Sequence, residues 1–74
     1  MIEERLKEIL ETVLELESNE YSEEISTENS EKWDSIKHLQ LMSTLEEEFD
    51  VNFSDEDLLS LTSFKTIEAR IKEI

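Results

Sequence analysis

The sequence predicts an all-α fold, a small four-helix bundle in which three longer helices accompany one short one. Apolar residues recur at spacings of three and four in at least three segments, which is the period of helices that bury one face. The one segment with strand-like alternation has no partner strand elsewhere in the chain. A length of 74 residues predicts a single domain, 1–74, with a compact core and no deep catalytic cleft.

The N-terminal part predicts a helix at about residues 2–17, followed by a long loop over 18–34. The helix has one apolar face, formed by Ile2, Leu6, Ile9, Leu10, Val13 and Leu14, then Leu16. The loop is rich in serine, threonine and asparagine and loses the periodicity, which leaves room for one short helical turn. Its main apolar anchors are Ile25 and Trp33, with Tyr21 as a weaker one. Loops of this length are often functional.

The next helix is expected from Ser35 to Phe49 or Asp50. Either Asp34 or Ser35 is suited to cap the free backbone N–H groups of its first turn. Its last turns carry an acidic triplet, residues 46–48, ahead of Phe49. The predicted buried face consists of Ile36, Leu39, Met42, Leu45 and Phe49, with Leu41 on the flank.

The C-terminal third predicts a short helix at about 55–60 and a final helix after it. Val51 and Phe53 form an extended connector that plugs into the core. Ser54 and Asp57 have the spacing of a capping box. We expect Leu58 and Leu59 of the short helix, and Leu61 just after it, to point inward. Thr62 or Ser63 caps the last helix, whose apolar face is Phe64, Ile67, Ile71 and Ile74.

The charge balance restricts the choice of partners. The chain holds 21 acidic and 7 basic residues, a formal net charge of −14. Nucleic acid and anionic membranes are therefore not expected as partners, whereas a protein with a basic patch would be attracted. The absence of cysteine excludes disulfides and fits a reducing cytoplasm. Neither a signal peptide nor a membrane-spanning run is evident, so we expect a cytoplasmic protein without membrane insertion.

The residue inventory argues against an enzyme or a metal site. His38 is the only histidine, and we expect a partly exposed helix residue rather than the base of a triad with Ser35. The acidic run from Asp50 alternates like a calcium loop, but its sixth and twelfth positions are Asp55 and Leu61 instead of glycine and glutamate. A binding or carrier role therefore remains, and an enzyme is a distant alternative.

The segment Trp33-Asp34-Ser35-Ile36 resembles the Asp-Ser-Leu signature of the acyl and peptidyl carrier protein family. The resemblance continues through residues 39–49, which are similar to the family's second helix, residues 51–56, which are similar to the entry to its third, and residues 62–71, which are similar to its fourth. It implies a phosphoprotein in which Ser35 carries 4′-phosphopantetheine, transferred from coenzyme A, with Asp34 as its motif neighbour. The terminal thiol of that arm would hold acyl groups as thioesters.

The resemblance implies a role in fatty acid or polyketide biosynthesis, and the departures from the pattern indicate a specialised carrier, such as one from a secondary-metabolite or surface-modification pathway. Members that serve housekeeping fatty acid synthesis usually carry acidic residues after the serine, where this chain has Lys37, His38 and Gln40. Trp33 also replaces the small residue common before the aspartate. Two alternatives remain open: an aminoacyl or peptidyl carrier, and an unmodified acidic interaction module.

The resemblance also implies the partners of the chain. We expect a monomer that binds a phosphopantetheinyl transferase, and acyl-transferring or condensing enzymes with basic patches. The expected contact residues lie along the helix that follows the serine. They are Ile36, Lys37, Gln40, Glu46 and Glu47.

The net charge yields a first prediction, on stability in salt. Because 21 carboxylates repel one another in the folded state, moderate salt or millimolar divalent cations should raise the melting temperature. A thermal melt followed by circular dichroism across a salt titration measures this. An unchanged melting temperature would contradict it.

Overall fold

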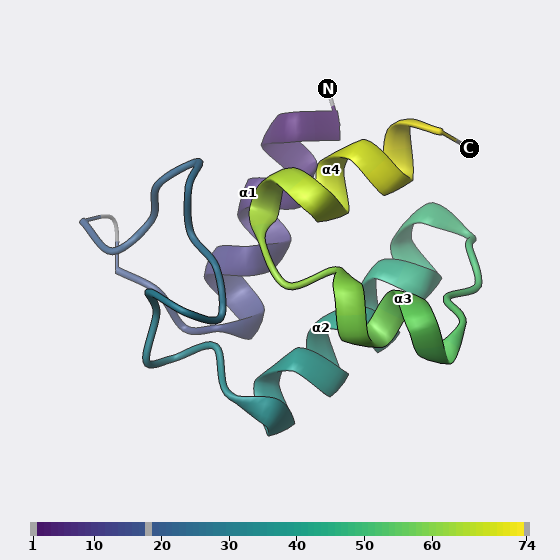
Figure 1. Cartoon of the computed structure of the whole chain (residues 1–74). Coiled ribbons are helices and arrows are strands. Elements are labelled where there is room, and N and C mark those ends of the chain that lie inside the picture. Colours follow the sequence, from purple (N-terminus) through teal and green to yellow (C-terminus); the bar gives the residue numbers. More distant parts are fainter. Residues whose placement is uncertain (1, 18, 74) are drawn as a thin grey trace.

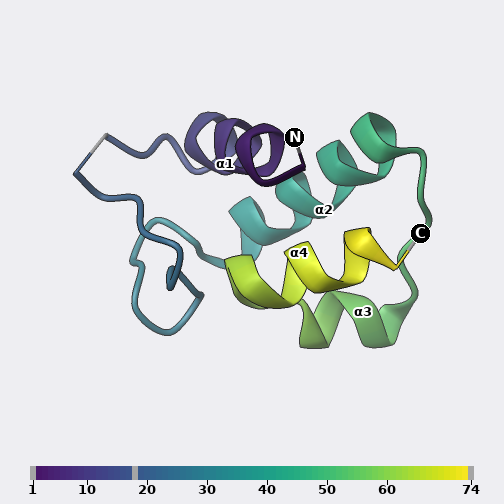
Figure 2. The ribbon, with the colours of Figure 1, turned by 90° about the horizontal axis from the view of Figure 1, so that it is seen from above.

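The computed structural model describes residues 2–17 and 19–73, and these form four helices without a strand. Their bounds are Ile2–Val13 for α1, Ser35–Phe49 for α2, Asp55–Ser60 for α3 and Phe64–Lys72 for α4 (Figure 1). The predicted all-α bundle with one short third helix is confirmed. The view from above shows the long α1–α2 loop extending to one side of the helices (Figure 2). No helix of the described part has the length and apolar character needed to cross a membrane.

One apolar core joins the helices to the loops between them. Helix α3 contributes no fully buried residue to this core, but Leu61 directly after α3 is buried. The predicted face of α4 is confirmed for Phe64, Ile67 and Ile71, while Ile74 lies outside the described residues. The buried side chains are Leu6, Ile9, Leu10, Leu14, Ile25, Trp33, Leu41, Met42, Leu45, Leu61, Phe64, Ile67 and Ile71.

Helix α1 ends at Val13, four residues before the predicted end. Glu15 adopts the left-handed conformation with φ of 55°. The N–H of Leu16 then reaches back to the carbonyl of Glu11 at 2.9 Å, which is the 6→1 bond of a Schellman turn. The apolar spacing misled the prediction because Leu14, buried just beyond the last helical residue, continues the same face.

The long loop is held to the core at several points and contains no full helix in its described part, residues 19–34. One helical turn is present, because the N–H of Ser30 bonds the carbonyl oxygen of Ser26 at 3.1 Å. Ile25 and Trp33 are buried as predicted. Tyr21 packs edge-on against Phe64 with ring centroids 5.7 Å apart. Backbone bonds from Thr27 N to Thr62 O (2.9 Å) and from Phe64 N to Ile25 O (3.0 Å) tie the loop to the α3–α4 connector.

Helix α2 has the predicted bounds but not the predicted buried face. Leu41, Met42 and Leu45 are buried, whereas Ile36 and Leu39 are 69% and 58% exposed. The helix is turned so that His38 takes the inward position on its first turns, where two hydrogen bonds satisfy its ring. On α3, Leu58 is partly buried, but Leu59 is 82% exposed, so it does not point inward as predicted.

Side-chain caps define the starts of the last two helices. Ser54 and Asp57 form the predicted capping box of α3. Ser63, rather than Thr62, caps α4, and Thr66 completes a second box. At the C-terminal end of α2, Asp50 adopts the left-handed conformation with φ of 53°.

The left-handed Asp50 gives a prediction on stability. Glycine adopts this conformation without the steric cost that a Cβ imposes. The free energy of unfolding of Asp50→Gly should therefore be about 0.5–1 kcal/mol higher than that of Asp50→Ala, which removes the same carboxylate but keeps the Cβ. Urea denaturation of both variants measures the difference. An alanine variant as stable as the glycine variant would rule out backbone strain at this residue.

Candidate functional site

Ser35 is the first residue of α2, and its side chain is exposed. Asp34 acts as the N-cap, since its carboxylate accepts a hydrogen bond from the backbone N–H of Lys37 at 2.9 Å. Ser35 is therefore not needed as the cap, and its hydroxyl makes no hydrogen bond within the described residues. The structure thus leaves a free primary alcohol at the positive end of a helix, where negative charge is stabilised.

A hydrogen-bond chain through His38 supports this helix end. The indole N–H of Trp33 donates to Nδ1 of His38 at 3.0 Å, and Nε2 lies 2.7 Å from the carbonyl oxygen of Leu58. Since Nδ1 accepts a hydrogen bond, the ring carries its proton on Nε2 and donates it to Leu58. The loop before Ser35, α2 and α3 are therefore joined next to the serine.

His38 is a partly exposed helix residue, as predicted, but its role as a bridge was not predicted from the sequence. A signal was present. His38, Leu41, Met42 and Leu45 share one helical face, with spacings of three, one and three. A histidine in an apolar stripe predicts a satisfied, half-buried ring.

Two lysines converge on the end of α1. Lys37 Nζ binds the carboxylate of Glu15 at 2.6 Å, and Lys32 Nζ binds the backbone carbonyl of the same residue at 2.9 Å. The hydrogen bond from Lys37 lowers the pKa of the exposed Glu15 carboxyl below its usual value. Because the folded-state pKa is the lower one, this pair stabilises the fold at neutral pH and is lost as the pH falls through that pKa.

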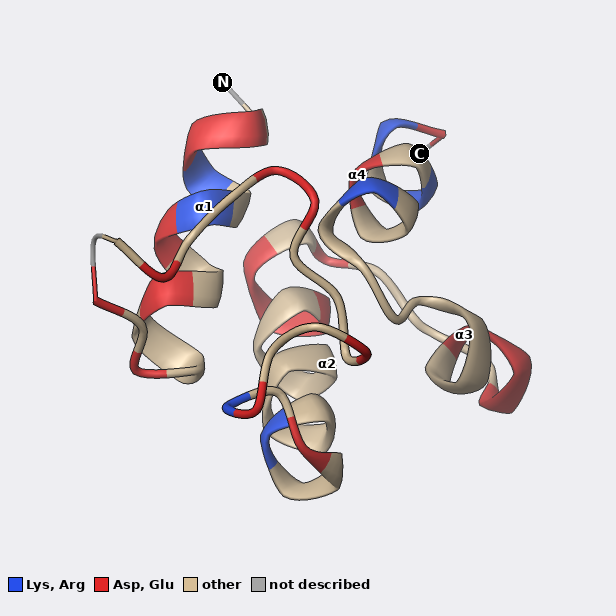
Figure 3. Cartoon of the chain, turned by 60° about the vertical axis from the view of Figure 1, so that its left-hand side comes forward, with Lys and Arg blue, Asp and Glu red and all other residues tan. Residues whose placement is uncertain are grey.

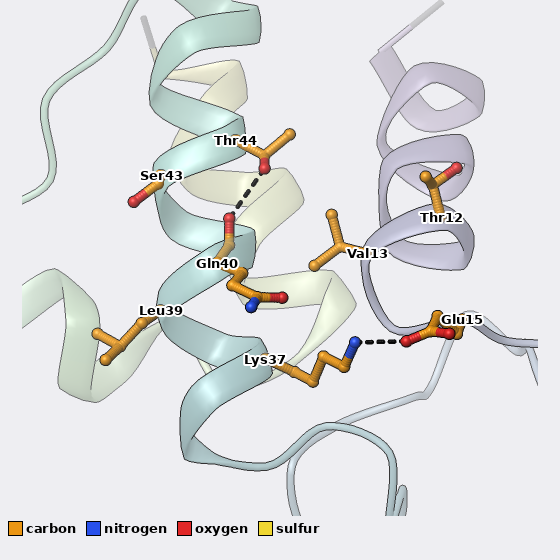
Figure 4. Close-up of a pocket in the computed structure, with 8 residues that line it drawn as sticks. All are labelled: Thr12, Val13, Glu15, Lys37, Leu39, Gln40, Ser43 and Thr44. Carbon is orange, nitrogen blue, oxygen red and sulfur yellow. Dashed lines mark hydrogen bonds and ion pairs between the residues drawn. The ribbon is translucent and has the colours of Figure 1, made fainter.

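The Lys37–Glu15 ion pair crosses a shallow groove between α1 and α2, with a volume of about 630 Å³ (Figure 4). Gln40, an expected contact residue, lies beside the pair and its side chain is exposed. Six of the eight lining residues are of polar types, and Leu39 points away from α1 (Figure 4). The lining residues are Thr12, Val13, Glu15, Lys37, Leu39, Gln40, Ser43 and Thr44.

The acidic end of α2 is largely engaged within the chain. Glu46 accepts a hydrogen bond from the backbone N–H of Phe53 at 2.7 Å, which holds the connector to α3. Glu48 pairs with Arg5 of α1. Glu47 alone of the three is exposed without an ion pair in the described part of the chain. Figure 3 shows the acidic turn at the far end of α2 from its basic and neutral first turns.

A comparison with known protein families identifies the chain. Residues 4–71 match the family model described as a phosphopantetheine attachment site. The match includes Ser35, all of α2 and α3, and all but the outermost residues of α1 and α4. The chain belongs to this carrier family. No curated protein matches it significantly. Domains of the phosphopantetheine attachment site family are where 4′-phosphopantetheine is covalently attached, which establishes the expected cofactor and the carrier class.

Within this carrier domain, the His38 bridge predicts an energetic coupling with Trp33. Trp33→Phe removes the indole donor, and His38→Ala removes the acceptor. A double-mutant cycle measured by urea denaturation should give a coupling of about 0.5–1.5 kcal/mol, the net contribution of one hydrogen bond. Additive effects would show that the two rings act independently.

Proposed function

We propose that the chain is a carrier whose Ser35 hydroxyl bears the 4′-phosphopantetheine group. The supporting observation is the division of roles at the start of α2. Asp34 caps the helix, so the exposed Ser35 hydroxyl is left free inside the region that matches the family. In the attachment step, Ser35 Oγ forms a phosphoester with the phosphopantetheine phosphorus of coenzyme A. The adenosine bisphosphate portion leaves, and a separate transferase takes the hydroxyl proton.

The local electrostatics suit that phosphodiester. Ser35 lies at the N-terminus of a helix of 15 residues, where the backbone N–H groups and the helix dipole favour an anion. Asp34, the nearest carboxylate in the sequence, is already bonded to the N–H of Lys37. Lys37 adds a positive charge close by, although Glu15 holds its ammonium.

We propose an acyl cargo and a specialised pathway in the cytoplasm, with a phosphopantetheinyl transferase as the first partner. The support for a specialised pathway is that the first turns of α2 carry Lys37, His38 and Gln40 in place of acidic residues. An aminoacyl cargo is the alternative. Loading assays with acyl and aminoacyl donors separate the two, and full activity with the enzymes of housekeeping fatty acid synthesis would count against a specialised role.

Attachment is tested by mass. The apo protein is incubated with coenzyme A and a broad-specificity phosphopantetheinyl transferase, and its intact mass is measured. One phosphopantetheine adduct is expected on the parent and none on Ser35→Ala. Ser30→Ala, in the loop, is the matched control and should still be modified. A parent that stays unmodified would favour an acidic interaction module that keeps this fold.

A further inference from the structure

The bridge through His38 requires a neutral imidazole. The indole N–H of Trp33 can only donate, so Nδ1 of His38, 3.0 Å away, must accept. The carbonyl oxygen of Leu58 can only accept, so Nε2, 2.7 Å away, must donate. The two partners thus fix a single neutral tautomer of the ring.

A proton on Nδ1 would affect the two bonds differently. It would place a second N–H against the indole N–H, where no acceptor remains, whereas Nε2 would keep its proton and its bond to Leu58. The indole also presents its N–H edge to the ring, and the edge of an aromatic ring is its positive part. Protonation should therefore break the bond to the loop and keep the bond to α3.

The position of Trp33 gives this loss a structural effect. Trp33 is 2% exposed, so its freed N–H reaches water only if the end of the loop moves. His38 is half-buried, and a solvent proton can reach its ring. Trp33 directly precedes Asp34, the N-cap of α2, and Ser35 follows. A release of Trp33 would therefore loosen the segment that leads into Ser35.

None of the charged side chains near His38 on α2 and in the loop pairs with its ring. Asp34 accepts the N–H of Lys37 at 2.9 Å, and the ammonium of Lys37 is held by Glu15 of α1 at 2.6 Å. The other charged side chains at the end of the loop, Glu31 and Lys32, are exposed.

The neighbouring helices offer the ring no counter-ion either. Asp57 of α3 accepts the N–H of Ser54 at 3.0 Å and pairs with Arg70 of α4 at 3.7 Å. The other charged side chains at the start of α3, Asp55 and Glu56, are exposed. Within residues 2–17 and 19–73, no acid lies at ion-pair distance from a ring nitrogen. A protonated ring would lose the indole and gain no carboxylate.

We propose that His38 is a pH-sensitive latch, which fastens the end of the loop when its ring is neutral and releases Trp33 when the ring is protonated. Histidine suits such a role, because its charge changes between about pH 5 and 8. The chain has one histidine and one tryptophan, so each side of the latch has a single reporter. The latch does not depend on attachment at Ser35.

The test follows the isotope-labelled protein by NMR from about pH 7.5 to about pH 5.5, the interval in which histidine side chains take up a proton. The single indole N–H peak should shift, and its exchange with solvent should rise about tenfold beyond the change in intrinsic rate. The N–H of Leu61, which donates to Asp57 O at 2.8 Å, should keep its protection because α3 stays bonded to the ring.

His38→Gln is the matched control. Its side-chain amide stays neutral and offers both a donor and an acceptor, so the indole signal should no longer depend on pH in this interval. Trp33→Phe tests the latch from the other side and decides the matter if His38→Gln does not fold. The backbone N–H of residue 33 donates to Ser30 O at 3.3 Å in the parent, and without the indole its corrected exchange rate should be the same at both pH values.

Three results would overturn the inference in the parent and the glutamine variant. They are an indole peak that does not respond to pH, an equal loss of protection at Leu61, and a response that persists in His38→Gln. The last two would show that carboxylates loosen the fold as a whole. In Trp33→Phe, a pH-dependent exchange rate at residue 33 would also overturn it.

Discussion

The arrangement of this small bundle depends on the hydrogen-bond chain from Trp33 through His38 to Leu58. Its two bonds of 3.0 and 2.7 Å fix how α2 is rotated about its own axis. Because His38 faces inward, Ile36 and Leu39 must face out, and Ser35 lies at the exposed entry to the helix. The same ring joins the end of the long loop to α3, a helix with no fully buried residue of its own.

The sequence predicted the order and number of the helices, and the bounds of α2 and α3, because side-chain caps and periodicity are local signals. Ser54 with Asp57 and the apolar face of α4 could be read directly. The rotation of α2 could not be predicted in this way, because two sets of residues have helical spacing along it. The set with Ile36 and Leu39 is wholly apolar, whereas the set that faces the core contains His38. The stripe that contains His38 is favoured only when Trp33 and Leu58 supply its partners, and both come from other parts of the chain.

The site was predictable for a similar reason and to a similar extent. The short motif around Ser35 is local, so its place at the start of α2 and its exposure followed from sequence. The ion pairs and hydrogen bonds of the neighbouring charged residues could not be predicted from the sequence. Glu15 lies 22 residues from Lys37 and meets it only because α1 ends early at Val13. Glu46 likewise turns from solvent to bond the backbone N–H of Phe53.

The exposed Leu59 has a consequence for the protein at high concentration. An exposed apolar side chain favours contact between identical copies, and here mutual repulsion between molecules of charge −14 opposes such contact. That repulsion weakens as the Debye length shrinks from about 10 Å at 0.1 M salt to about 3 Å at 1 M. The acidity of the chain therefore opposes self-association through the exposed Leu59.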